Sequence, residues 1–243
     1  MRACAVFLLC VLACHAAAQS NAPANSTLSP FAAAKARTLM AARLPCLGCH
    51  GFQGVGGRVG PDLSGVSARR TSAYIAAIVD DPQGVVPGTA MPRTAMTPEL
   101  RALVLATLVG TAPASVPPPR VPRSTVSASA TRPVGATLYA RYCASCHGDD
   151  GGGDGPNARF LPVRPAVHRD ARAMSTRTDD RLFDAISGGG YPLGKNAAMP
   201  AFGGTLSRAE IWSLVEYLRT LCRCAPPGWS TDGERGMRSP SRR

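Results

Sequence analysis

The sequence predicts an all-α protein built from two small helical domains in tandem, joined by a Pro/Ser-rich linker. Three observations lead to this prediction. The same five-residue motif begins at Cys46 and again at Cys143. Apolar residues recur at helical spacing behind N-cap residues in both halves. A stretch rich in proline and serine separates the halves, as is typical of a semi-rigid linker.

The N-terminal segment has the features of a secretory signal. Residues 1–18 contain one basic residue, Arg2, then a short apolar run, and end in the small residues of Ala16–Ala18. The apolar run is too short for a stable membrane-spanning helix. The segment therefore predicts export to the periplasm, with lipid attachment at Cys14 as the alternative interpretation.

The remaining boundaries follow from composition. A polar leader covers residues 19–30, and a linker containing three consecutive prolines covers residues 113–132. Residues 225–243 form a basic Ser/Gly/Pro-rich tail that is expected to be disordered. This leaves two domains, residues 31–112 and 133–224.

The repeated motif carries the chemistry of both domains. Cys46–His50 and Cys143–His147 have the form Cys-x-x-Cys-His, which is the attachment pattern of c-type haem. A zinc or disulfide site is the alternative, but zinc ribbons place their second cysteine pair only about 15–20 residues after the first. We therefore expect two covalently bound haem c groups, with iron ligands His50 and His147. The thioether-forming residues would be Cys46, Cys49, Cys143 and Cys146.

Each half also offers a ligand for the other face of the iron. Met91-Pro92 and Met199-Pro200 occupy matching places before the last helix of each half. A methionine sulfur raises the reduction potential of haem iron, and the adjacent proline would stiffen the loop. Met91 and Met199 are the expected ligands, and Met96 remains the alternative in the first half.

The first half has the pattern of three main helices. An Ala-rich helix is predicted over Phe31–Leu44, directly before the first motif. Thr71 is expected to cap a second helix, and Thr97 a third that ends at Gly110.

The second half repeats this plan. A helix over Gly135–Tyr142 leads into the second motif, and Thr178 is expected to cap a middle helix. Ser207 and Glu210 have the spacing of a capping box at the start of the last helix.

With these motifs in place, the sequence resembles two class I cytochrome c domains in tandem, that is, a dihaem cytochrome c. The resemblance implies that a proline carbonyl accepts a hydrogen bond from each iron-binding histidine. Pro61 matches this position in the first domain; in the second, Pro162 is the better match and Pro156 the alternative. Such a bond would fix the ring orientation of the histidine.

The resemblance also implies that the first and last helices of each domain cross through a glycine and an aromatic pair. Gly135, Tyr139 and Tyr217 fit this pattern in the second domain. The first domain departs from it, since its first helix is alanine-rich and Ala106 stands where the second domain has Tyr217.

Three further residues have more than one interpretation. His168 lies in a Pro/Arg-rich loop and is interpreted as a solvated histidine, with replacement of Met199 as iron ligand as the alternative. Cys222 and Cys224 are interpreted as a local disulfide or two inert thiols, with bound copper as the alternative. Outside the signal there are three histidines in all, which excludes two haems that each bind two histidines.

The composition and charge favour an electron carrier. The net charge of +12 would steer docking on acidic redox proteins, and no nucleic-acid-reading motif accompanies it. We expect electron transfer between a periplasmic dehydrogenase or other donor and a respiratory-chain acceptor, such as a terminal oxidase or another cytochrome. Membrane contact would be peripheral at most. The alternative is a cytochrome subunit of a dihaem oxidoreductase, or that enzyme itself, acting on sulfur compounds or peroxide; a sensor or assembly module is the third class.

Overall fold

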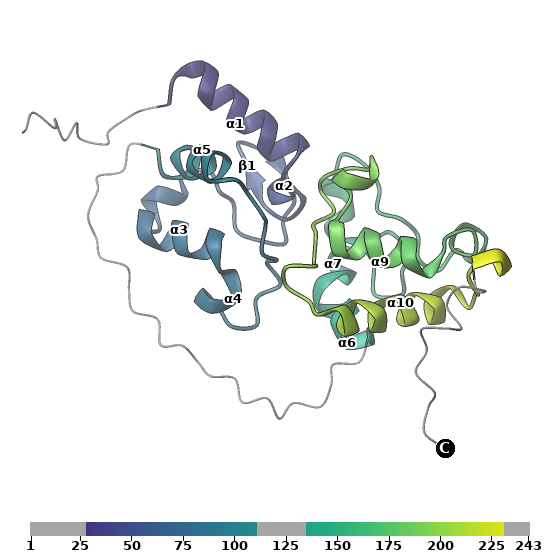
Figure 1. Cartoon of the computed structure of the whole chain (residues 1–243). Coiled ribbons are helices and arrows are strands. Elements are labelled where there is room, and N and C mark those ends of the chain that lie inside the picture. The colour runs from purple at the N-terminus through teal and green to yellow at the C-terminus, as the bar shows by residue number, and fades with distance from the viewer. Residues whose placement is uncertain (1–27, 111–134, 231–243) are drawn as a thin grey trace, which may run out of the picture.

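The computed structural model describes residues 28–110 and 135–230, and within these ranges the chain forms two helical lobes (Figure 1). The predicted signal with Cys14, the predicted linker, and residues 231–243 of the predicted tail lie outside the described residues. None of the helices in the described ranges is long and apolar enough to cross a bilayer. The predicted all-α class with two tandem domains is confirmed.

The first lobe contains short and long helices around one small hairpin. Its elements are α1 (Pro30–Ala42), α2 (Cys46–Cys49), β1 (Gly51–Phe52), β2 (Val55–Gly56), the 3₁₀ turn η1 (Val66–Ala68), α3 (Ser72–Asp80), α4 (Pro82–Val85) and α5 (Pro98–Val109). The hydroxyls of Thr71 and Thr97 accept hydrogen bonds from backbone N–H groups in the first turns of α3 and α5, as predicted. Gly110 ends α5 with a φ of 59°, which favours glycine.

The core of the first lobe lies between α1, α3 and α5. On α1, Ala36 and Met40 are fully buried, and α1 packs against α5. The buried cluster consists of Met40, Leu44, Phe52, Ile75, Val104 and Leu108.

The second lobe follows the same order of helices. Its elements are α6 (Gly135–Tyr142), α7 (Ala144–His147), η2 (Ala158–Phe160), α8 (Ala171–Met174), α9 (Asp179–Gly188), η3 (Tyr191–Leu193), α10 (Arg208–Cys222) and η4 (Gly228–Ser230). Thr178 caps α9, and Ser207 and Glu210 form the predicted capping box of α10. The short turn η4 lies in the predicted disordered tail, where the Ser230 hydroxyl donates to the Pro227 carbonyl.

The crossing of α6 and α10 depends on Gly135. A Cβ at Gly135 would lie less than 3.0 Å from the Ser213 carbonyl and from Tyr217, so the helices approach too closely for any side chain there. Tyr139 and Tyr217 pack beside this contact, with ring centroids 5.3 Å apart. The glycine and aromatic crossing expected for the second domain is therefore present.

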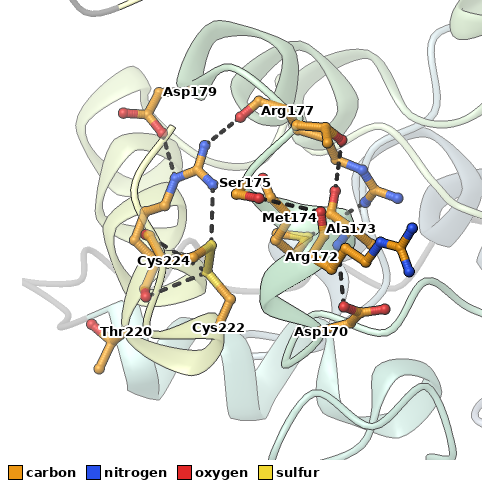
Figure 2. The surroundings of a disulfide bond; sticks show 12 residues. Asp170, Arg172, Ala173, Met174, Ser175, Arg177, Asp179, Thr220, Cys222 and Cys224 are labelled. Carbon is orange, nitrogen blue, oxygen red and sulfur yellow. Dashed lines mark hydrogen bonds and ion pairs between the residues drawn. A yellow bond between two sulfur atoms is a disulfide. The ribbon is translucent and has the colours of Figure 1, made fainter. Parts of the chain in front are cut away.

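The end of α10 is fastened to the α8–α9 segment. Cys222 and Cys224 form a disulfide, which confirms one of the two interpretations made for the pair and excludes the copper site. Figure 2 shows these cysteines opposite Met174, with Arg177 and Asp179 farther from the disulfide. The Arg219 guanidinium donates to the Asp179 carboxylate and to two backbone carbonyls in this segment.

Candidate haem sites

In both lobes the Cys-x-x-Cys-His motif forms a single helical turn. The His50 N–H donates to the Cys46 carbonyl, and the His147 N–H donates to the Cys143 carbonyl, each at 2.9 Å. A turn of this kind brings residues three positions apart onto one face. All four motif cysteines are free thiols, so each pair is available for thioether bonds on one side of its turn.

Three of the four motif thiols, those of Cys46, Cys49 and Cys143, lie where burial disfavours the charged form. Burial raises the pKa of Cys46 to about 11 and that of Cys143 to about 12. Burial, together with smaller contributions from the nearby Cys146 and Cys46, raises the pKa of Cys49 to about 12. These sulfurs are therefore neutral near pH 7, as suits groups that pack against the apolar edge of a porphyrin.

The His50 ring is held by a backbone carbonyl and a glycine. Its Nδ1 lies 2.7 Å from the Pro61 carbonyl oxygen, so Nδ1 carries the proton and Nε2 is left as the metal-binding atom. The hydrogen bond expected at Pro61 is therefore present. A Cβ at Gly60 would lie less than 3.0 Å from the His50 ring, so Gly60 leaves the space that this ring occupies.

The His147 ring is held in the same way by a different residue from the one predicted. Its Nδ1 lies 3.0 Å from the Ala166 carbonyl oxygen, so the expectation for Pro162 is wrong. The His168 N–H donates to the Gly151 carbonyl at 2.7 Å, and this bond brings the end of the loop, with Ala166, beside the motif. Burial lowers the pKa of His147, which keeps the ring neutral, as a metal ligand must be.

His168 is buried against the second motif, and its prediction as a solvated loop residue is wrong. Its ring stacks on the His147 ring, with centroids 4.1 Å apart and an interplanar angle of 15°. Its Nδ1 is 3.0 Å from the Tyr139 hydroxyl. Burial, together with smaller contributions from the neighbouring His147 and Arg177, lowers the pKa of His168 to about 2.

This position bears on the alternative role considered for His168. Its ring lies beside that of His147, and its Nδ1 is engaged by the Tyr139 hydroxyl, so only Nε2 is left for another partner. The glycine at position 151, where a Cβ would lie 3.0 Å from that of His168, is the sequence signal that the loop folds back here.

The loops that carry Met91 and Met199 are fixed through their backbones. The Gln83 amide donates to the Met91 carbonyl at 2.6 Å, and the Gly190 N–H donates to the Met199 carbonyl at 3.0 Å. Met91 and Met199 are both partly buried. Met96, the alternative ligand, packs instead against the hydrophobic cluster of the first lobe.

A cavity of about 350 Å³ lies in the second lobe between α9, the residues just before it, and the segment from Leu193 to Lys195. Its polar lining includes three cationic side chains, those of Arg177, Arg181 and Lys195, and no acidic side chain. The apolar part is lined by Leu182, Ala185 and Leu193. The cations of this lining suit an anionic group, and Cys143, Cys146 and His147 are not among the lining residues.

The structure brings the two motifs together, although they belong to different lobes. A Cβ at Gly48, in the first motif, would lie less than 3.0 Å from the Ala198 carbonyl, next to Met199 of the second lobe. The Asn157 amide donates to the Gly48 carbonyl at 2.8 Å. No pattern in the sequence indicated this contact.

Two protein families match the chain, one in each lobe. Residues 33–104 match the family described as cytochrome c, and residues 130–218 match the family described as cytochrome c oxidase, cbb3-type, subunit III. No curated protein matches the chain. A solved structure, the reducing HAO-like protein complex Kustc0457/Kustc0458 of Kuenenia stuttgartiensis, is similar at 24% identity over 62% of this chain and 72% of that chain, with a TM-score of 0.30.

Proposed function

The chain belongs to the c-type cytochromes, with two cytochrome c domains in tandem, and we propose from this that it binds two haem groups and passes electrons between redox proteins. Cytochrome c domains hold covalent haem c and serve electron transfer. One observation supports the proposal of two haem groups per chain. In both lobes the motif histidine has its Nδ1 at a backbone carbonyl, at 2.7 Å from Pro61 and 3.0 Å from Ala166, which leaves both Nε2 atoms for iron.

Each residue type has a distinct role in this proposal. When bound, the haem iron supplies one-electron chemistry by cycling between Fe(III) and Fe(II). The carbonyls of Pro61 and Ala166 orient the imidazoles and raise their basicity as ligands. Met91 and Met199 would supply thioether ligands to the iron, and a thioether ligand favours Fe(II). The groups that hold the porphyrin are Cys46, Cys49, Cys143 and Cys146.

The basic cavity of the second lobe would bind the haem carboxylates. Arg177, Arg181 and Lys195 line it without an acidic neighbour in the lining, so the cavity favours a negatively charged group. A charge-assisted hydrogen bond from a guanidinium to a carboxylate is among the stronger polar contacts in proteins. These residues therefore orient the group as well as neutralise it.

We place the protein in the periplasm, where it accepts electrons from a dehydrogenase or other donor and delivers them to a respiratory-chain acceptor. The predicted signal over residues 1–18 supports export, and the Cys222–Cys224 disulfide is typical of an oxidising compartment. The net charge of +12 favours acidic partners, and this attraction weakens as salt rises.

A haem assay on the protein matured in a host that attaches c-type haem tests the proposal. The pyridine haemochrome spectrum should give two haems per chain, and both should stay with the chain after denaturation in detergent. The reduced protein should bind no carbon monoxide, because methionine closes both irons. Rapid carbon monoxide binding would favour the alternative, an oxidoreductase with an open iron.

A further inference from the structure

The two Cys-x-x-Cys-His segments meet at one buried side chain. Asn157 follows the second motif and begins the turn η2, and it is only 3% exposed. Its backbone N–H donates to the Ser145 carbonyl at 2.9 Å, which ties it to the second motif. Its side-chain amide then reaches across to the first lobe, so a single residue touches both haem attachment segments.

The Asn157 amide group is fully used in this contact. Its Nδ2 donates to the Gly48 carbonyl at 2.8 Å and to the Cys146 sulfur at 3.2 Å. Its Oδ1 accepts a hydrogen bond from the Arg58 N–H at 2.7 Å. A buried amide whose donors and acceptor are all satisfied costs little to bury, and it permits one arrangement of its partners.

Two glycines of the first lobe make room for the contact. A Cβ at Gly57 would lie less than 3.0 Å from both the Gly48 carbonyl and Asn157 Oδ1. A Cβ at Gly48 would lie less than 3.0 Å from the Ala198 carbonyl. The equivalent position of the second motif is Ser145, so the motif does not itself require glycine there. Gly48 is required by the close approach of the Ala198 carbonyl.

Further bonds between the lobes surround this centre. The Arg93 N–H donates to the Thr205 hydroxyl at 2.9 Å, and the Arg43 guanidinium donates to the Tyr191 hydroxyl at 2.7 Å. The Arg141 guanidinium also donates to the Gly88 carbonyl. The contact thus has a buried centre and a polar rim, which is the arrangement of a specific interface.

We propose that Asn157 is a positioning residue that locks the two haem attachment segments together, so that electrons pass directly between the two haem sites of one chain. The inference rests on the proposed function. One electron leaves a ferrous iron, which is oxidised to ferric, and reduces the other iron from ferric to ferrous; no bond forms or breaks.

This arrangement has a consequence for the thioether sulfurs. Cys146 Sγ would be a thioether sulfur of the second haem, and Asn157 links it through one amide group to the backbone of the first motif. The route from the Cys146 sulfur to the Gly48 carbonyl passes through two hydrogen bonds of one buried amide group. Either lobe can therefore accept an electron from a donor and the other can deliver it.

Two variants test the role of this contact. Asn157→Leu removes all three side-chain hydrogen bonds while it keeps a similar side-chain volume. Gly48→Ser introduces the residue that the second motif has at the equivalent position, and its Cβ would clash with the Ala198 carbonyl. Gly188→Ser is the matched control, because a Cβ at Gly188 would meet only the Pro192 ring at 3.9 Å and Gly188 takes no part in the contact around Asn157. All are measured as the haem-loaded full chain.

The first readout is the rate of electron exchange between the haems after photoreduction, and the second is amide hydrogen exchange at Arg58. Asn157→Leu and Gly48→Ser should slow the electron exchange by about tenfold or more, since the step depends steeply on the placement of the two centres. Both should also speed hydrogen exchange at Arg58, whereas Gly188→Ser should change neither.

The inference is overturned if both variants keep the electron exchange rate and the Arg58 protection of the unaltered protein. The haem count separates this result from a failure of the proposed function. Two haems with unchanged exchange rates in the variants refute only the role of Asn157. Fewer than two haems in the unaltered protein refute the proposed function itself.

Discussion

Replacement of Arg219 by alanine should strongly destabilise the second lobe. The Arg219 guanidinium donates to the Asp179 carboxylate at 2.7 Å and to the backbone carbonyls of Met174 and Arg177 at 2.9 and 2.6 Å. The side chains of Arg219 and Asp179 are only 13% and 12% exposed. The pair therefore joins α10 to the start of α9, and solvent screens its charges only weakly.

The size of the effect follows from what the substitution leaves behind. Arg219→Ala strands the Asp179 carboxylate in a buried position, and removal of one partner of a buried ion pair costs about 3–5 kcal/mol. The two carbonyls also lose their donor, which favours the upper part of this range. Removal of both charges, as in Arg219→Met with Asp179→Leu, should recover much of the loss, because no unpaired charge remains.

Guanidinium chloride unfolding of the haem-loaded protein, followed by Soret absorbance and far-ultraviolet circular dichroism, measures this cost. Arg101→Ala is the matched control, since Arg101 pairs with Asp80 in the first lobe through exposed side chains at 39% and 45%. An exposed pair of this kind is worth little. A loss of stability in Arg219→Ala no larger than that in Arg101→Ala would refute the reasoning.

Three further predictions concern the haem sites. Gly60→Ala should displace the His50 ring from its carbonyl partner and weaken iron binding in the first lobe, seen as an altered Soret spectrum. Met91→Ala should remove part of the red charge-transfer band of methionine-bound Fe(III), whereas Met96→Ala should leave it in place. His168→Leu should destabilise the second lobe by about 1–3 kcal/mol in chemical unfolding, because it leaves a buried hydroxyl without its partner.

Each of these predictions has a matched control. Gly188→Ala tests for a general effect of replacing glycine, since a Cβ there would meet only the Pro192 ring at 3.9 Å. An equal spectral change in Gly188→Ala and Gly60→Ala would contradict the role of Gly60. His168→Gln retains a polar partner for Tyr139 and should lose less stability than His168→Leu. If Met96→Ala removes the charge-transfer band and Met91→Ala does not, Met96 is the ligand.

Local features of the fold could be predicted because each depends on a few neighbouring residues. Thr71, Thr97 and Thr178 cap helices where their hydroxyls were expected to do so, and Ser207 with Glu210 forms its box. The haem motif is likewise a local pattern, so both copies could be found directly.

Features that depend on the path of a loop could not be predicted in the same way. Proline was expected to hold His147, but any residue can supply a backbone carbonyl, and the loop places Ala166 there instead of Pro162. The same loop buries His168, although its Pro/Arg-rich sequence indicated an exposed segment. The charge and hydropathy of a loop report its average environment, and they do not identify the one side chain that turns inward.

The contact between the lobes could not be predicted from the sequence either. Asn157 and Gly48 lie far apart in the chain and carry no local pattern that pairs them. Their contact arises from the packing of two separately formed lobes, and it becomes visible only when backbone carbonyls and amides are placed in space.

Intact mass measurement of the denatured, matured chain tests the central claim most directly. The account predicts a mass increase equal to two haem groups, with one haem lost from each variant in which the cysteines of one motif, Cys46 with Cys49 or Cys143 with Cys146, are replaced by alanine. A folded, colourless chain whose mass matches the polypeptide alone would contradict the account.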